Sequence, residues 1–459
     1  MARNRSKDVT EAAQVVIVGA GIAGVSTAFH LVRLGVTDIA IADPLPPLSL
    51  TSDKSTECYR DWWPTLPMFR LMSRSIDLLE RYTHESSDRF TLSRRGYLYA
   101  TADRSTLGAM VADAERIAAT ASMPLRYHAR QPYGYRPADL DRWDHNPSGA
   151  DVFLDGAGLR RAFPFLASDV AGGVHVRRAG WLSAQQLGAW MIEQIIDAGV
   201  VFIRGAVTGA TVESGRVRSI TVDEQVEVST ATVVNAAGPL AGEVGAHLGV
   251  EVPVSSEIHQ KVSFDDHRGG IAREAPMVIW HDPQQIGWSD EERSLLTASG
   301  RADTTGVLPP FVHGRPEGGD QSRWALGLWA WHEAVTNRPR WPIDEDPLYP
   351  ELVLRGLGTM LPAMRAYEEG LPHHTVDGGY YTKTIDNAPL IGPVGPTGSY
   401  VCTALSGYGI MASCGAGELA ALHITNGPLP DYADAFRVER LSDPAYRAQA
   451  AVLRSLGQI

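Results

Sequence analysis

The sequence predicts an α/β protein with two domains, one built on a parallel sheet and the other on a mostly antiparallel sheet. Two observations predict the first domain. A short apolar run, residues 14–18, leads directly into Gly19-x-Gly21-x-x-Gly24, and a second apolar run, residues 39–42, ends at Asp43. A third observation predicts the second domain: residues 250–375 lose the alternation of strand and helix patterns and are richer in tryptophan, proline and charge.

Composition sets the class of protein and excludes several partners. The 459 residues are 44% hydrophobic and 20% charged, which is typical of a folded enzyme, and the net charge of −12 argues against a nucleic-acid partner. No run approaches the roughly 18 apolar residues that span a membrane, and residues 1–14 lack the apolar core of a signal peptide. Three cysteines without CxxC spacing indicate neither a disulfide framework nor a zinc site. We expect a cytoplasmic protein with no metal and no membrane partner.

The elements of the first domain follow from periodicity and from turn residues. A helix is expected from about 23 to 34 and another from 67 to 82, with a proline-rich loop after Asp43. Ser183 is the expected N-cap of a helix that runs to Ala198 and stops at Gly199. Three short strands are expected from Val200 onward, turning at Ser214-Gly215 and ending in residues 232–238. Residues 399–404 predict a further strand, and a helix is expected from about 416 to 424.

The glycine pattern predicts a dinucleotide site. Gly19 permits a tight turn, Gly21 lets the backbone approach a pyrophosphate, and Gly24 lets the helix pack on the strand. Asp43 lies 19 residues beyond Gly24 at a strand end, where a carboxylate accepts hydrogen bonds from a ribose diol.

Four further blocks extend the pattern through the chain. They are Gly172-Gly-Val with Gly180, Val233-Val-Asn-Ala-Ala-Gly-Pro239, Thr384-Ile-Asp-Asn-Ala-Pro-Leu-Ile-Gly392, and Ala404-Leu-Ser-Gly-Tyr-Gly-Ile-Met-Ala-Ser-Cys-Gly-Ala-Gly-Glu418. In this order the blocks resemble the FAD-dependent amine and amino-acid oxidoreductases of the D-amino-acid oxidase, glycine oxidase and sarcosine oxidase type. Residues 250–375 match that family only in outline.

The resemblance implies a Rossmann-like FAD-binding domain that is discontinuous in sequence, made of residues 10–85, 171–248 and 375–430. Residues 86–170 and 249–374 would form an α+β substrate domain with an antiparallel sheet, and residues 431–459 a C-terminal tail. The expected FAD contacts are Gly19, Gly21, Gly24, Asp43, Ser52, Thr56, Ala237, Gly238, Gly407, Tyr408, Gly409, Ile410 and Met411.

Departures from the family concern the flavin tether and the substrate. Sarcosine-type members tether FAD through a cysteine, and Gly379 stands at that position here, so we expect non-covalent FAD. Members of the family hold a substrate carboxylate with a positively charged residue at the position of Tyr381 or of Met411. Neither Tyr381 nor Met411 carries a positive charge. Arg60 is the best-placed remaining cation. Residues 262–382 lack the lysine that promotes reaction with oxygen, and Lys54 is the candidate to replace it.

Aromatic residues and one histidine complete the predicted substrate site. His332 is a candidate for a family active-site histidine. Several tryptophans indicate an aromatic pocket for a bulky or cationic amine: Trp62, Trp63, Trp280, Trp324, Trp329 and Trp331.

The implied reaction is the oxidation of a C–N bond of a small amine by hydride transfer to flavin N5, giving an imine, with O2 or another acceptor taking the electrons. Two alternatives stay open. An FAD monooxygenase shares the N-terminal glycine pattern, although Ser406-Gly407-Tyr408-Gly409 stands where such enzymes carry Gly-Asp. A flavoprotein subunit that passes electrons within a complex is the second. The sequence predicts neither the amine nor the oligomeric state.

Overall fold

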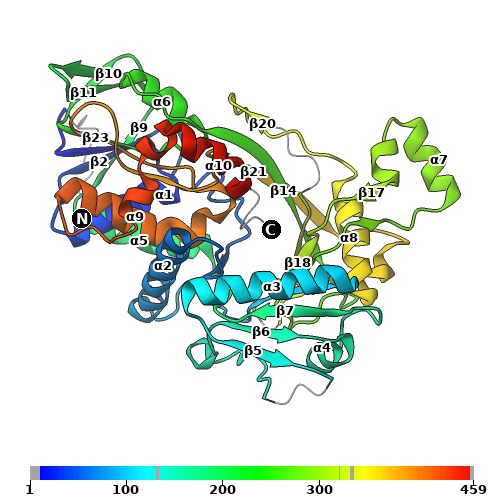
Figure 1. Ribbon diagram of the computed structural model, residues 1–459. Coiled ribbons are helices and arrows are strands. Elements are labelled where there is room, and N and C mark those ends of the chain that lie inside the picture. Colours follow the sequence, from blue (N-terminus) through cyan, green and yellow to red (C-terminus); the bar gives the residue numbers. More distant parts are fainter. Residues whose placement is uncertain (1–10, 131–133, 320, 331–334, 455–459) are drawn as a thin grey trace, which may run out of the picture.

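Two sheets organise the molecule in the computed structural model, which describes residues 11–130, 134–319, 321–330 and 335–454 (Figure 1). The first has six strands in the order β22-β23-β13-β1-β2-β9. Its parallel strands are β1 (Val15–Val18), β2 (Ile39–Asp43), β9 (Val201–Arg204), β13 (Thr232–Asn235) and β23 (Ser399–Thr403). Strand β22 (Leu390–Pro393) pairs antiparallel with β23 at the edge.

Strand β1 is buried on both faces, which explains its continuous run of apolar residues. Val15 and Ile17 pack against α1 (Ile22–Arg33), α2 (Leu66–Glu85), α5 (Ala184–Asp197) and α9 (Gly409–Thr425). Val16 and Val18 pack on the opposite face, against the small sheet of β10 (Val207–Glu213), β11 (Arg216–Val222) and β12 (Val226–Ser229) and against α6 (Ala241–His247). The alternation of side chains along a strand produces this three-layer arrangement.

The predicted helices are present, with one shifted start. Ser183 caps α5 by accepting a hydrogen bond from the Gln186 N–H, as the sequence predicts. Helix α9 begins at Gly409, not near residue 416. Gly415 and Gly417 therefore lie inside α9, and a Cβ at Gly417 would overlap Ser26 of α1. The glycines of this segment predict a turn, but in the structure they permit the close approach of two helices.

From Val201 to Asn235 the structure has five strands where the sequence predicts three. These are β9, β10, β11, β12 and β13, and the turn predicted at Ser214-Gly215 joins β10 to β11. Strands β3 (Cys58–Arg60) and β8 (Ala179–Trp181) form a separate antiparallel pair.

The second sheet has ten strands and is mostly antiparallel. Its strands are β4 (Tyr97–Thr101), β5 (Leu125–His128), β6 (Ala150–Phe153), β7 (Gly172–Val176), β14 (Ser255–Asp265), β15 (Met277–Trp280), β18 (His313–Pro316), β19 (Trp324–Leu328), β20 (Val335–Thr336) and β21 (His374–Lys383). Strands β7 and β21 pair within this sheet, although the sequence-based division assigns nearly all of their residues to the first domain. The long strands β14 and β21 extend from the second sheet towards the first (Figure 1).

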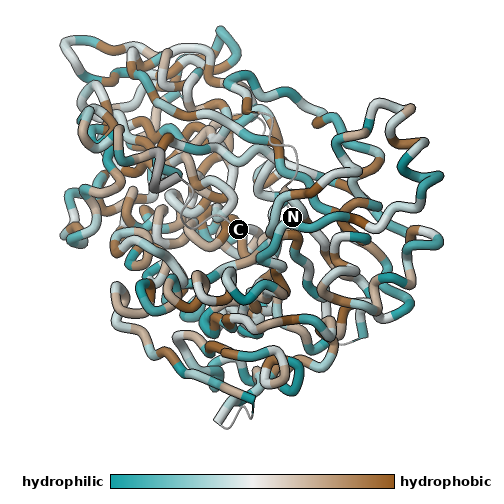
Figure 2. Tube along the Cα trace, turned by 45° about the vertical axis from the view of Figure 1, so that its right-hand side comes forward, coloured by the Kyte–Doolittle hydropathy of each residue, from teal (hydrophilic) through white to brown (hydrophobic). Residues whose placement is uncertain are grey.

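Helices α3 (Arg104–Ala121), α4 (Gly156–Ala162) and α8 (Tyr349–Met360) accompany the second sheet. Helix α7 (Asp290–Ala298) projects from the body together with the short strands β16 (Gln284–Gln285) and β17 (Val307–Leu308) (Figure 1). The most continuous hydrophobic stretches lie within the part that contains the parallel sheet, and hydrophilic stretches lie at the periphery (Figure 2). None of the helices in the described ranges is long and apolar enough to cross a membrane.

The C-terminal segment after α9 packs on the first domain. It contains two short 3-10 turns, Ala433–Phe436 and Val438–Ser442, and α10 (Pro444–Arg454). Phe436 is fully buried in the core that also contains α1 and α9, so this segment is an integral part of the domain.

Candidate functional site

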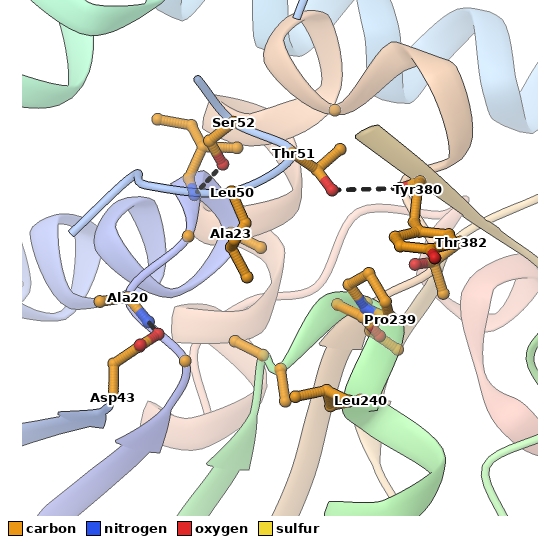
Figure 3. Close-up of a pocket in the computed structure, with 18 of the residues that line it drawn as sticks. Ala20, Ala23, Asp43, Leu50, Thr51, Ser52, Pro239, Leu240, Tyr380 and Thr382 are labelled. Carbon is orange, nitrogen blue, oxygen red and sulfur yellow. Dashed lines mark hydrogen bonds between the residues drawn. The ribbon is translucent and has the colours of Figure 1, made fainter. Parts of the chain in front are cut away.

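A cavity of about 430 Å³ lies at the carboxyl ends of the parallel strands (Figure 3). The segments that follow β1, β2, β13 and β23 line it, with residues 19–23, 43–52, 236–240 and 403–410 contributing most of the wall. Residues 380–382 of β21 and Trp341 close it from the second sheet. The crevice outside the carboxyl ends of parallel strands is the general place for ligands in open α/β sheets.

The turn between β1 and α1 has the geometry of a dinucleotide-binding loop. Gly19 has a φ of 107°, which favours glycine, and a Cβ at Gly24 would overlap the Gly19 carbonyl oxygen. The Ile22 N–H donates to Ser52 Oγ at 3.0 Å, which fixes the loop after β2 beside the helix N-terminus (Figure 3). The predicted residues Gly19, Gly21 and Ser52 therefore meet at one end of the cavity.

Asp43 lines the same cavity and also fastens the turn. Its carboxylate accepts a hydrogen bond from the Ala20 N–H at 2.8 Å (Figure 3). It also accepts one from the Leu45 N–H at 2.7 Å. Each oxygen accepts one backbone bond, so acceptor capacity remains for a ribose diol. Ribose binding by Asp43 stays a prediction, and the structure adds a role in holding the β1–α1 turn that the sequence pattern does not indicate.

A second cavity, of about 80 Å³, adjoins the first. Tyr381, Ser406 and Gly407 line both cavities, so they form the boundary between them. A Cβ at Gly407 would overlap the Tyr381 ring, and this glycine therefore permits the close approach of β21 to the start of α9.

The structure brings three of the predicted substrate-site residues together in this small cavity: Arg60, Tyr381 and Met411. Thr56, predicted as a flavin contact, also lines it, whereas Ala237, Gly238, Gly409 and Ile410 line the large cavity. Lys54 lines neither. It pairs with Asp53 at 2.6 Å and with Asp377 at 3.8 Å. His332 lies outside the described residues.

Arg60 is held on aromatic faces. Its side chain is 6% exposed, and its guanidinium carbon lies 4.7 Å from the Trp63 ring centroid and 5.9 Å from that of Tyr97. The Nε group donates to the Trp62 carbonyl oxygen at 3.3 Å. A guanidinium stacked in this way keeps a fixed orientation towards the cavity.

Two histidines that the sequence reasoning missed also line the small cavity, His259 of β14 and His313 of β18. Burial lowers the pKa of His313 to about 4, and the nearby Arg60 charge acts in the same direction. His313 is therefore neutral near pH 7. Strand alternation could have assigned each histidine to one face of its own strand, but it could not bring the two to one cavity, because that depends on the pairing of distant strands.

Two of the sequence blocks are bonded to each other at the start of α9. Ser406 Oγ donates to Asn387 Oδ1 at 2.7 Å, and the Tyr408 hydroxyl donates to the Asn387 carbonyl oxygen. The Tyr408 ring meets Trp63 edge to face at 5.0 Å. No acidic residue stands in the first turn of α9, so its N-terminus presents positive potential to the cavity boundary.

Trp341 and Cys402 are further lining residues of the large cavity that sequence reasoning did not assign. Burial raises the pKa of the Cys402 thiol to about 12. Within the described ranges, no group of three or more histidine, cysteine, aspartate or glutamate side chains is arranged to hold a metal ion.

Comparison with known proteins agrees with this geometry. The family model described as DAO, FAD dependent oxidoreductase, matches residues 14–422. The chain belongs to this family of FAD-dependent oxidoreductases, and its cofactor is FAD. The match does not favour the monooxygenase or the electron-transferring subunit that the sequence left open.

Three solved structures illustrate the shared fold. The L-proline dehydrogenase from P. horikoshii superposes with a TM-score of 0.72 at 19% identity, covering 95% of this chain and 99% of its own. The glycine oxidase from Geobacillus kaustophilus gives 0.69 at 16% identity, covering 94% and 99%. The iminodiacetate oxidase from Chelativorans sp. BNC1 gives 0.67 at 18% identity, covering 92% and 98%.

Proposed function

We propose that the protein oxidises a CH–NH or CH–NH2 bond of a small amine or amino-acid-like substrate. The observation that carries the proposal is the pair of adjoining cavities, in which a buried arginine and several aromatic rings stand beside the start of α9. Proteins with this fold include a proline dehydrogenase, a glycine oxidase and an iminodiacetate oxidase. All three names refer to compounds with a C–N bond, which supports the proposal.

The residues present fit FAD. The β1–α1 turn, with Gly19, Gly21 and Gly24, would receive the pyrophosphate, and Asp43 would bind the adenosine ribose. Ser52, Ala237 and Gly238 would form the walls around the cofactor. Thr56 and the segment from Gly407 to Met411 would face the flavin, beside the positive end of α9. FAD, when bound there, accepts a hydride from the substrate carbon.

The chain would bind and orient the amine in the small cavity. Arg60 would receive a substrate carboxylate, because it places a buried positive charge at this cavity. Tyr381 and Met411 carry no charge that could balance a buried carboxylate. Trp63, Trp329 and Tyr408 provide an apolar wall that excludes water. The described residues around this cavity include no lysine, and Lys54 would have to leave Asp53 and Asp377 to act on oxygen. The electrons then pass to O2 or to another acceptor.

We further propose a cytoplasmic location. All three cysteines are buried and free, which agrees with a reducing compartment.

The deciding experiment is anaerobic mixing of the FAD-loaded protein with a panel of amines, amino acids and secondary amines. We expect at least one compound to bleach the yellow flavin absorbance, and admission of air then shows whether O2 restores it. Loss of colour with hydroxy acids, and with no amine, would contradict the proposed function.

A further inference from the structure

The pairing of β14 with β21 builds a row of polar side chains across two strands. The register places Ser255 opposite Lys383, Glu257 opposite Tyr381, and His259 opposite Gly379. Because side chains at positions two apart share a face, the side chains of Glu257, His259, Tyr381 and Lys383 project from the same face of this strand pair. Tyr381 and His259 line the small cavity at one end of the row.

A chain of contacts connects the four members. The His259 and Tyr381 rings stack with their centroids 3.9 Å apart and their planes at 15°. His259 Nε2 lies 3.6 Å from Glu257 Oε2, and Lys383 Nζ donates to the same oxygen of Glu257. The order of contacts is therefore Lys383, Glu257, His259 and Tyr381, running from the interior to the cavity.

Burying charged side chains costs free energy unless each is paired with an opposite charge. The Glu257 and Lys383 side chains are each 1% exposed, and the His259 side chain is 11% exposed. An ion pair withdrawn from water is often no more stable than an apolar pair of the same volume, so stability alone is weak evidence for its presence. What the pair does provide is a fixed, buried carboxylate beside an imidazole at the edge of a reaction cavity.

We propose that His259 accepts the proton of the bound substrate ammonium, and that Glu257 and Lys383 are positioning residues for this transfer. The inference rests on the proposed function, because hydride leaves the carbon only when the adjacent nitrogen is a neutral amine. An N–H bond of the ammonium breaks, its electron pair stays on the substrate nitrogen, and an N–H bond forms on the imidazole. Glu257 then faces an imidazolium, which a carboxylate stabilises.

Other charged or titratable groups face the same cavity, and they do not take this role. Arg60, from β3, carries a guanidinium group, which donates hydrogen bonds and has no acceptor for a proton. Burial lowers the pKa of His313, from β18, to about 4, so it is a weak base near neutrality. Tyr381, stacked on His259, carries a phenol, whose oxygen is a far weaker base than an imidazole nitrogen.

The test is the pH dependence of anaerobic flavin reduction in His259→Gln, using the amine from the panel that reduces the wild type fastest. We expect the variant to bind FAD with unchanged stoichiometry and to reduce it at least tenfold more slowly at pH 7. At pH 10, where the amine itself loses its proton, the rate should return to within about threefold of the wild type. Glu257→Gln should shift the pH profile of flavin reduction in the same direction by a smaller amount, because the glutamine can still accept a hydrogen bond from Lys383.

The control is His267→Gln, a change at an exposed histidine just beyond β14, which should reproduce the wild-type profile. An unchanged rate of His259→Gln at pH 7 would overturn the proposal, and so would an equal loss at every pH, which a structural role predicts. If no amine reduces even the wild type, the proposed function falls and this inference falls with it. If wild type is reduced and the profile does not move, only this inference falls.

Discussion

Arg440 of the C-terminal segment forms a two-pronged ion pair with Asp386, its Nε donating to Oδ2 at 2.7 Å and its Nη2 to Oδ1 at 3.1 Å. Both side chains are buried, at 7% and 1% exposure. Burial alone would raise the pKa of Asp386, but the hydrogen bonds and charge of Arg440, with help from Thr384 and Tyr446, hold that pKa at about 2. The next residue, Asn387, bonds Ser406 and Tyr408 at the cavity boundary, so the C-terminal segment supports the cofactor site.

Arg440→Met should therefore destabilise the protein, by about 3–5 kcal/mol, because it leaves a buried carboxylate without its partner. The sign of the pH dependence should also change. In the wild type, a pKa of about 2 means that Asp386 stabilises the fold above pH 4, and this contribution is lost as the pH falls towards 2. In the variant, burial should raise the pKa, so stability should fall as the pH rises above about 4. Thermal unfolding at pH 3, pH 5 and pH 8 measures both effects.

The matched control for this prediction is Arg437→Met, because Arg437 pairs only loosely with the exposed carboxylates of Asp434 and Glu439. An exposed pair contributes at most about 1 kcal/mol. Equal unfolding temperatures for the Arg440 and Arg437 variants would contradict the structural role of the Arg440–Asp386 pair.

Asp43→Ala should weaken FAD binding more than it alters the reaction. The change removes the acceptor for Ala20 and Leu45 and for the ribose diol, a loss of about 2–4 kcal/mol or roughly 30-fold or more in Kd. Asp38→Ala is the control, since Asp38 is also an aspartate beside β2 but accepts from the Gln14 N–H at the opposite end of the strand. Fluorescence titration of the apoprotein with FAD gives the Kd values, and wild-type affinity in Asp43→Ala would refute the ribose assignment.

FAD should be bound without a covalent link. Gly379 packs against Thr51 where tethered relatives carry a cysteine, and the buried Cys402 thiol, with a pKa of about 12, is a poor nucleophile. After acid denaturation and centrifugation, all yellow colour should remain in the supernatant. Colour that stays with the pellet after washing in denaturant would show a tether at another residue.

Trp341 should slow the release of FAD by covering the large cavity. It lines that cavity and packs edge to face on Tyr380 at 5.2 Å, and the Tyr380 hydroxyl bonds both the N–H and the carbonyl oxygen of Arg340. Trp341→Ala should release FAD about three- to tenfold faster, from a loss of roughly 1 kcal/mol of aromatic contact. Trp324→Ala is the control at a partly exposed tryptophan of β19. Equal release rates in the two variants would remove Trp341 from the cofactor site.

Arg60→Ala should distinguish substrates by their carboxylate. For an amino acid that reduces the flavin, loss of a buried charge partner should cost about 2–5 kcal/mol in kcat/KM, whereas an aromatic amine without a carboxylate should react at nearly the wild-type rate. Glycine, sarcosine and D-alanine should be poorer substrates of the wild type than a bulkier amino acid, because they are too small to contact the aromatic wall of Trp63, Trp329 and Tyr408. If sarcosine reduces the flavin at low millimolar concentration, and Arg60→Ala leaves that rate unchanged, the carboxylate binds elsewhere.

The sequence by itself determined those parts of this protein whose structure depends only on residues close to them in the sequence. The strand–glycine–helix unit from Val15 to Arg33 and the capping of α5 by Ser183 are local. They follow from residues within one or two turns of each other, whose backbone preferences do not depend on the rest of the chain. The position of Asp43 at the end of β2 follows in the same way.

Only the tertiary structure decided which distant side chains meet. Glu257 and Tyr381 lie opposite each other because β14 pairs with β21 in one register, and a shift by one residue would turn His259 away from the cavity. Lys54 pairs with Asp53 and Asp377 instead of lining a cavity, and Arg440 meets Asp386 across 54 residues. Charges pair according to distance and burial in the folded chain, and neither quantity is encoded in any short stretch of sequence.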